Sequence, residues 1–281
     1  MRSIQAAQIT QAVADLFLEC SYCIGDDVRQ AIDDAIKTEP SPIGRNTLQQ
    51  ISDNYTIAAN ERVAICQDTG MSVVFAEVGQ DLHIENGDFE EAIQQGVREA
   101  YLQGYLRKSI VAEPLFERKN TKDNTPAIIH TRIVPGDRLK LLAVAKGFGS
   151  ENMSALKMLV PADGIEGVKR FILETVENAG PNPCPPIVIG VGIGGTFEKA
   201  AIMAKQGTAL PLDHSNADPR YKQLEDDLLR EVNALGVGPG GTGGRTTALK
   251  VHILYAPTHI AGLPVAVNIC CHAARHASQV L

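Results

Sequence analysis

The chain has 281 residues, of which 44% are hydrophobic and 21% charged, and its formal net charge is −7. These fractions are close to the averages of globular domains and exclude a chain that is disordered throughout. No apolar run approaches the ~18 residues of a membrane span, and the acidic balance argues against nucleic acid as a partner because it repels polyanions. The first twenty residues carry Asp15 and Glu19 within an amphipathic pattern, unlike a signal peptide. We therefore expect a cytoplasmic protein that binds neither membranes nor nucleic acid.

The first half of the chain alternates between helical and strand-like patterns. Apolar residues recur at helical spacing from Ile4 to Phe17 and from Val28 to Ile36. A third helix is expected to begin at Pro42, because proline is favoured at the first helical position. Further along, the patterns predict a buried strand at 71–78, a helix at 88–106, and two strands at 127–134 and 138–147 joined by a hairpin-like turn at 135–137.

The second half continues in the same way. The patterns predict helices at 165–176, 197–206 and 221–235, strands at 185–192, 248–257 and 262–271, and a polar turn after the last strand. Neither a repeat nor a low-complexity linker divides the chain. We therefore expect one mixed α/β domain spanning residues 1–281, with several short strands in small sheets packed against helices.

Three cysteine positions stand out from the rest of the chain. Cys66 lies two residues before Asp68 in ICQDTG, Cys184 lies among prolines that forbid a helix, and Cys270-Cys271 ends a strand. A thiol can also be a small buried hydrophobe, so each position alone has a purely structural interpretation. Together they could converge on one metal centre, although their wide separation leaves this to the tertiary fold.

The remaining pair, Cys20 and Cys23, has no second pair in range of the kind that structural zinc sites use, so we assign it to helix packing or turn chemistry, with metal or redox use as the alternative. Disulfides are improbable in a cytosolic chain of this size.

Two glycine-rich segments are candidate phosphate-binding loops. Gly190–Gly195 satisfies G-x-G-x-x-G between a strand and a helix, the arrangement of dinucleotide-binding enzymes. The residues that follow this helix supply no apolar strand to complete the βαβ unit. Gly236–Gly244 lacks the Lys-Ser/Thr ending of an ATP-binding P-loop. A nucleotide-dependent enzyme is therefore the weaker alternative.

Seven motifs spread over essentially the whole chain carry a resemblance to one enzyme family. They are ICQDTG, YLRKSIVAEPLF, AKGFGSENMSALKML, GPNPCPP, GVGIGGTFEKAA, GVGPGGTGGRTTALKVHI and THIAGLPVAVNICCHAARH. Together they resemble the α subunit, or N-terminal half, of the class I iron–sulfur fumarate hydratases, whose close relatives include the two-subunit L-tartrate dehydratases. The resemblance implies a hydro-lyase that reversibly hydrates fumarate to L-malate, with tartrate dehydration to oxaloacetate as the alternative. The Lys146–Asn152 segment favours fumarate, because it is similar to the corresponding loop of fumarate hydratases.

The same resemblance implies a [4Fe–4S] cluster held by three cysteines, with one iron left open for the substrate. Cys66 and Cys184 match two of the ligands. The third ligand is Cys271 or Cys270, and the twelve-residue spacing from His259 favours Cys271. Cys270 is then an additional thiol with a packing role.

Five other positions match substrate-site residues of the family. Asp68 is the candidate acid or base, with turn capping as its structural alternative, and Gln67 is expected to reach the substrate beside it. Arg107 matches a carboxylate-binding arginine, and His259 matches a histidine that contacts the substrate. Gly149 is expected to offer a backbone N–H to a substrate oxygen, since the missing Cβ permits a close approach.

The resemblance also implies a partner. In the family the other basic residues and a catalytic threonine belong to a β subunit, so we expect an α2β2 assembly that acts on a small dicarboxylate. A cluster carrier without turnover is the alternative from a different class. The presence of Asp68, Arg107 and His259 argues against it, because a carrier does not require a dicarboxylate site.

Overall fold

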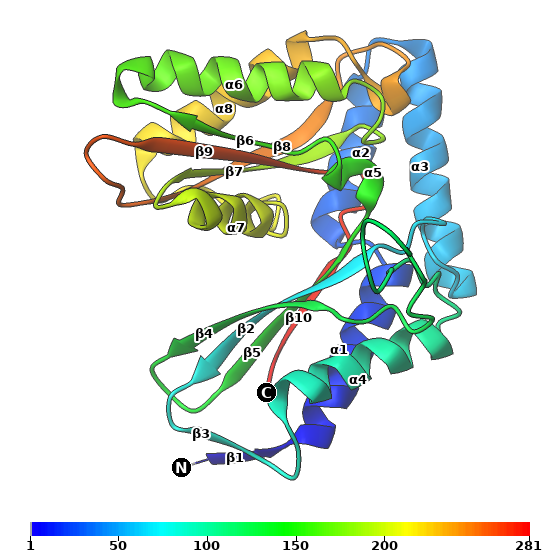
Figure 1. Cartoon of the computed structure of the whole chain (residues 1–281). Coiled ribbons are helices and arrows are strands. Elements are labelled where there is room, and N and C mark those ends of the chain that lie inside the picture. Colours follow the sequence, from blue (N-terminus) through cyan, green and yellow to red (C-terminus); the bar gives the residue numbers. More distant parts are fainter. Residues whose placement is uncertain (1) are drawn as a thin grey trace. The chain divides into compact units, whose positions relative to one another are not determined.

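The computed structural model describes residues 2–281, which form the helices and short strands of the expected α/β class (Figure 1). The chain separates into two compact units, each assembled from discontinuous segments. Unit 1 comprises residues 2–25, 55–148 and 275–281, and unit 2 comprises residues 26–54 and 149–274. Within the described range, no helix combines the length and apolar character needed to cross a membrane.

Unit 1 consists of a four-stranded sheet, a two-stranded sheet and two long helices. Its elements are β1 (Arg2–Gln5), α1 (Ala6–Tyr22), β2 (Met71–Gly79), β3 (Leu82–Glu85), α4 (Phe89–Gln103), β4 (Ile128–Val134), β5 (Leu139–Lys146) and β10 (His276–Val280), together with the end of α3 (Pro42–Glu61). The larger sheet has the order β10-β5-β2-β4, and β1 pairs in parallel with β3. Helix α1 packs on α4, β5 and β10, so the apolar core lies between these helices and the sheet.

The hairpin predicted for residues 127–147 is wrong. Strands β4 and β5 do not pair with each other, because β2 lies between them, parallel to β4 and antiparallel to β5. Strand β2 is almost fully buried and is therefore the centre of the sheet, whereas β4 is a largely exposed edge strand. The turn at Pro135–Asp137 passes over the end of β2, where the Gly136 carbonyl accepts the Asp81 N–H at 2.9 Å.

Two short strands at the ends of the chain also differ from expectation. The predicted N-terminal helix begins only at Ala6, since residues 2–5 form β1. The expected polar turn at the C-terminus covers residues 271–275, after which β10 pairs antiparallel with β5. Both strands are short and largely polar, so their sequences carry no strong apolar alternation.

Unit 2 is a four-stranded mixed sheet with helices on both faces. Its elements are α2 (Asp26–Thr38), the first part of α3, the end of α5 (Phe148–Glu151), β6 (Ala155–Leu159), α6 (Gly164–Ala179), β7 (Ile187–Gly194), α7 (Phe197–Gly207), α8 (Pro219–Ala234), β8 (Ala248–Ala256) and β9 (Leu263–Cys270). The strand order is β6-β9-β7-β8. Figure 1 shows α7 on one face of this sheet and α6 with α8 on the other.

The glycines of the G-x-G-x-x-G segment have a packing role. Gly190, Gly192 and Gly194 lie in the fully buried strand β7. A Cβ on Gly190 would lie 2.0 Å from the Ala204 carbonyl oxygen, and one on Gly192 would lie 2.0 Å from that of Ala200. These contacts with α7 require glycine, so the motif is explained by close strand–helix packing. The described residues give the nucleotide alternative no further support.

Candidate functional site

The Cys66–Gly70 turn of unit 1 connects the end of α3 to β2, and hydrogen bonds fix its shape. The Asp68 carboxylate accepts the Gly70 N–H at 3.0 Å through Oδ1 and the Phe148 N–H at 2.8 Å through Oδ2. Gly70 has φ +84° and no room for a Cβ, which would lie 2.8 Å from the Lys146 backbone. The turn capping weighed for Asp68 is therefore present in the structure. Each carboxylate oxygen still keeps a lone pair for another partner.

Two buried side chains, Tyr101 and Asn124, form hydrogen bonds to the backbone carbonyl groups of this turn, and neither was predicted from the sequence. The Tyr101 hydroxyl lies 2.8 Å from the Thr69 carbonyl oxygen and 3.0 Å from that of Gly70. The Asn124 amide donates to the same Gly70 oxygen at 3.2 Å. Burial raises the pKa of Tyr101 to about 12, so this phenol stays a neutral donor. A tyrosine on an apolar helix face has no sequence signal that distinguishes it from an ordinary core residue.

Because its backbone is held in this way, the turn presents side chains of three chemical types. Cys66 and Asp68 are half-buried and Gln67 is exposed, and the Cys66 Sγ lies 3.4 Å from the Gln67 Oε1. These three side chains occupy consecutive positions of one turn. The thiol can serve as a metal ligand, while the amide and the carboxylate can form hydrogen bonds with a bound molecule.

Arg107 lies directly beside this turn. The Thr69 hydroxyl donates to the Arg107 carbonyl oxygen at 3.0 Å, so the backbone at Arg107 is attached to the turn, while the arginine itself is exposed. The structure thus places four of the predicted site residues, namely Cys66, Gln67, Asp68 and Arg107, in one region of unit 1. An exposed guanidinium in this region can bind a carboxylate with two parallel hydrogen bonds.

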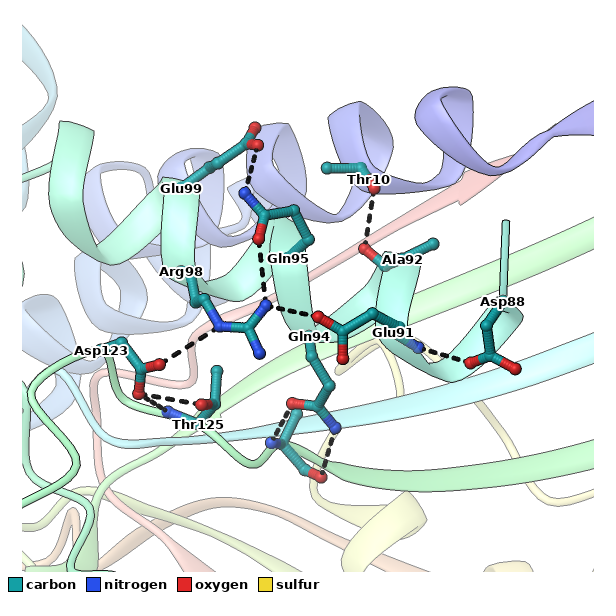
Figure 2. A network of polar contacts seen from close by, with 11 residues as sticks. Thr10, Asp88, Glu91, Ala92, Gln94, Gln95, Arg98, Glu99, Asp123 and Thr125 are labelled. Carbon is teal, nitrogen blue, oxygen red and sulfur yellow. Dashed lines mark hydrogen bonds and ion pairs between the residues drawn. The ribbon is translucent and has the colours of Figure 1, made fainter. Parts of the chain in front are cut away.

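The loop that follows Arg107 is anchored at its far end to α4. Figure 2 shows Arg98 donating to Glu91 at 2.7 Å, to Gln95 at 3.0 Å and to Asp123 at 3.2 Å. Asp123 also accepts the N–H and hydroxyl of Thr125. The hydrogen bond from Arg98 to Glu91, ahead of the ion pairs, raises the pKa of this arginine further. The loop is therefore tied down on both sides of its exposed middle.

In unit 2 the structure brings Cys184 and Cys271 to the same end of the sheet. The Cys184 carbonyl oxygen accepts the His272 N–H at 3.4 Å. Cys184 is exposed and has φ +53°, a left-handed conformation that is uncommon for a non-glycine residue. Cys271 is half-buried just beyond β9, whereas Cys270 is buried and pairs with Val188 inside the sheet. This difference favours Cys271 over Cys270 as the available thiol.

Gly149 lies at this same end of unit 2. A Cβ placed on it would lie 3.6 Å from the Asn182 carbonyl oxygen, in the loop that carries Cys184. Gly149 is exposed and follows Phe148, whose N–H is bonded to Asp68. The predicted role of its backbone N–H is compatible with this exposure.

His259 lies at the other end of unit 2. Strand β9 runs without interruption from Leu263 to Cys270, which at ~3.3 Å per residue corresponds to about 23 Å. The neighbouring Thr258 hydroxyl donates to the Gly195 carbonyl oxygen at 2.9 Å, which places this loop at the far end of β7. Within one chain, His259 is therefore not brought to Cys271.

The residues that directly follow the glycine-rich loop Gly236–Gly244 bind a carboxylate of the protein itself. Glu39, only 1% exposed, accepts N–H groups of Ser41, Arg245 and Thr246 and the Thr246 hydroxyl at 2.7–3.1 Å. Burial alone would raise the pKa of Glu39, but these hydrogen bonds outweigh it and the pKa is lowered. The loop in turn supports the Cys184 loop, because the Gly240 N–H donates to the Pro185 carbonyl oxygen at 2.8 Å. A phosphate-binding role for this loop therefore has no support.

All six cysteines are thiols. Cys20 is fully buried in unit 1, and burial raises its pKa to about 12, in agreement with the packing role assigned to it. Within residues 2–281, the structure places no three His, Cys, Asp or Glu side chains so that they could hold a metal ion.

Comparisons with known proteins agree with one another. The family model described as fumarate hydratase (Fumerase) matches residues 10–280. The chain is 43% identical over 276 residues to a Methanocaldococcus jannaschii protein named putative L(+)-tartrate dehydratase subunit alpha, with 96% of each chain covered. It is 30% identical over 278 residues to the L(+)-tartrate dehydratase subunit alpha of Escherichia coli K12, covering 98% of this chain and 91% of that protein. The matched region includes every candidate site residue.

Proposed function

Because the chain belongs to the fumarate hydratase family, we propose that it carries the α-subunit share of an active site that hydrates fumarate to L-malate. The chain is a hydro-lyase subunit. The observation that carries the proposal is the Cys66–Gly70 turn, in which a thiol and a carboxylate are held two residues apart beside an exposed arginine. We further propose that residues 1–281 act as one catalytic domain.

The cysteine donor set fits an iron–sulfur cluster. Cys66, Cys184 and Cys271 are exposed or half-buried outside the regular strands and helices, whereas Cys20 and Cys270 are buried. Cys23 is also half-buried, but it lies at the end of α1 and matches no ligand position of the family. We propose that the first three hold a [4Fe–4S] cluster, as the resemblance implies. When bound, such a cluster would supply a Lewis-acidic iron for a substrate carboxylate and hydroxyl.

The chain's own side chains would bind the substrate and move a proton. Asp68 would exchange a proton with the reacting carbon or its water, since each carboxylate oxygen has one remaining lone pair. Arg107 would bind a substrate carboxylate, Gln67 would hydrogen-bond beside it, and the Gly149 N–H would contact a substrate oxygen. In an assembled enzyme, Asp68→Asn should lower kcat by ~10²–10⁴. Arg107→Lys should chiefly raise KM, because an ammonium cannot reproduce the bidentate contact.

The position of His259 makes the proposal more specific. Because His259 lies at the opposite end of β9 from Cys271, it can serve the same site only if a second copy of the chain supplies it. A symmetric assembly containing two α chains provides this copy, since each chain then gives its His259 to the other. This argument supports the α2β2 assembly expected from the resemblance.

L(+)-tartrate is the second candidate substrate, because both curated relatives named above are called tartrate dehydratase subunits. The segment Lys146–Asn152 supports fumarate instead. The substrates are distinguished by measuring kcat/KM for fumarate hydration and for tartrate dehydration with the same anaerobic preparation of the α and β chains. A preference for tartrate would make this chain a tartrate dehydratase subunit and would leave the hydro-lyase assignment intact.

The cluster and the partner are tested with the same preparation. Cys66→Ser, Cys184→Ser and Cys271→Ser should each abolish the visible absorption of the reconstituted cluster, whereas Cys20→Ser and Cys270→Ser should keep it. The names of the relatives as subunits alpha support a dependence on a β chain. The isolated chain with its cluster should therefore be inactive, and added β chain should restore turnover. Turnover by the isolated chain would overturn the shared-site proposal.

A further inference from the structure

Arg275 is a buried cation beneath the Cys66–Gly70 turn of unit 1. It directly precedes β10, and its carbonyl oxygen accepts the Ala145 N–H from β5 at 3.0 Å. The residue is 2% exposed, and its Nε and Nη1 atoms have no hydrogen-bond partner. A guanidinium does not lose its proton in a protein, so this buried charge cannot be relieved by neutralisation. Buried charges normally have a partner of opposite sign, and unpaired donors in a native core need an explanation.

A carboxylate lies near the guanidinium across Gly147, without forming an ion pair with it. A Cβ placed on Gly147 would lie 3.3 Å from the Arg275 Nη2 and 3.4 Å from the Asp68 Oδ2, with no other side chain among its nearest atoms. The separation of Nη2 and Oδ2 therefore cannot exceed the sum of these two distances. Cys20 and Tyr101, which also lie in the field of Arg275, stay neutral because burial raises the pKa of each to about 12. Asp68 is thus a carboxylate beside the guanidinium.

We propose that Arg275 is the positioning residue of Asp68. The guanidinium attracts the Asp68 carboxylate towards Gly147 and so stabilises the conformation in which its oxygens accept the Gly70 and Phe148 N–H groups. An attraction of this kind is strong because the guanidinium is buried, where water screens it little. The effect of Arg275 on catalysis rests on the proposed function, whereas its effect on the conformation of residues 66–70 does not.

Gly147 lies beside both Arg275 and Asp68. Because it has no side chain, Arg275 and Asp68 approach each other from two sides of its Cα. A methyl group at this position would lie 3.3 Å from Arg275 Nη2 and 3.4 Å from Asp68 Oδ2, so it would shift the charged groups by no more than a few tenths of an ångström and leave both charges in place. The Gly147→Ala variant therefore tests the pair independently of any change to Arg275.

Hydrogen–deuterium exchange of the full-length chain tests the proposal without turnover. In Arg275→Met the Gly70 amide, which donates to Asp68, should exchange roughly tenfold faster or more. Gly147→Ala should give a smaller change in the same direction, and Arg275→Lys should restore much of the protection because it returns a positive charge. Arg170→Met, which removes an exposed arginine from α6, should leave the Gly70 amide unchanged.

A double-mutant cycle separates positioning from general packing. If Arg275 acts through Asp68, Arg275→Met should add nothing to the exchange of Gly70 in an Asp68→Asn background. Equal effects in both backgrounds, or faster exchange confined to β5 and β10, would overturn the proposal. If Arg275→Met does not fold, Gly147→Ala carries the same cycle. In the assembled enzyme Arg275→Met should lower kcat with KM unchanged, and a change in KM alone would instead indicate direct substrate binding.

Discussion

The buried carboxylate of Glu39 is predicted to stabilise the folded chain through its hydrogen bonds to Ser41, Arg245 and Thr246, and Glu39→Gln tests this. In the native chain its Oε1 accepts two backbone N–H groups, and its Oε2 accepts two N–H groups and the Thr246 hydroxyl. Glutamine keeps the shape but replaces one acceptor oxygen by a donor, so at least one backbone N–H, that of Ser41, loses its acceptor, and the other hydrogen bonds lose their charged acceptor. With about 1.5–3 kcal/mol for a hydrogen bond to a charged group and about 1–3 kcal/mol for a buried donor left unsatisfied, the free energy of unfolding should fall by about 3 kcal/mol.

The measurement is thermal and denaturant unfolding at pH 7, with Glu177→Gln on the exposed face of α6 as the control. A loss of about 3 kcal/mol corresponds to a fall in Tm of roughly 6–12 °C for a chain of this size. Because the pKa of Glu39 is lowered, its stabilisation is present above the unfolded pKa of 4.5 and is lost as the pH falls through the lower folded value. The difference between wild type and Glu39→Gln should therefore shrink in acid. Equal Tm values for wild type and Glu39→Gln at pH 7 would refute the reasoning.

Three further predictions follow from unit 2. Burial, and to a smaller extent the nearby charge of Lys250, lowers the pKa of His252 to about 4, so between pH 6.5 and pH 4 the unfolded chain binds a proton that the folded chain does not. The free energy of unfolding should therefore fall by about 2 kcal/mol from pH 7 to pH 5, and His252→Phe should remove this pH dependence. Gly192→Ala would place a Cβ 2.0 Å from the Ala200 carbonyl oxygen of α7 and should destabilise the chain by roughly 3 kcal/mol, whereas in the control Gly262→Ala the nearest atom is 3.9 Å away and stability should be unchanged. Equal stabilities of these two variants would contradict the packing argument. If His259 comes from a second copy, co-expression of His259→Asn and Cys184→Ser chains, each inactive alone, should restore about a quarter of the activity, and no recovery would show that His259 acts within its own chain.

Strong local periodicity identified most of the fold. The central strands β2 and β7 and the helices α4, α6, α7 and α8 are where the apolar patterns predict them, because each buries a continuous apolar face. The pairing of β4 with β5 was predicted wrongly, because a short turn between two strands does not reveal that a third strand, formed fifty residues earlier, lies between them. Periodicity reports which face of a strand is buried, whereas the identity of its neighbour depends on the tertiary fold.

The parts of the site that could not be predicted are charged residues with an unusual environment. Glu39 and Arg275 are 1% and 2% exposed, although sequence reasoning assigns such residues to the surface. Glu39 lies in no recognisable motif, and most of its hydrogen-bond partners are two hundred residues away in sequence. Arg275 lies within the last motif of the chain, but nothing in that motif reveals that its side chain is buried near the turn before β2. The motif ICQDTG therefore identifies candidate ligand-binding side chains, whereas the buried environments of Glu39 and Arg275 depend on distant segments that no local pattern reveals.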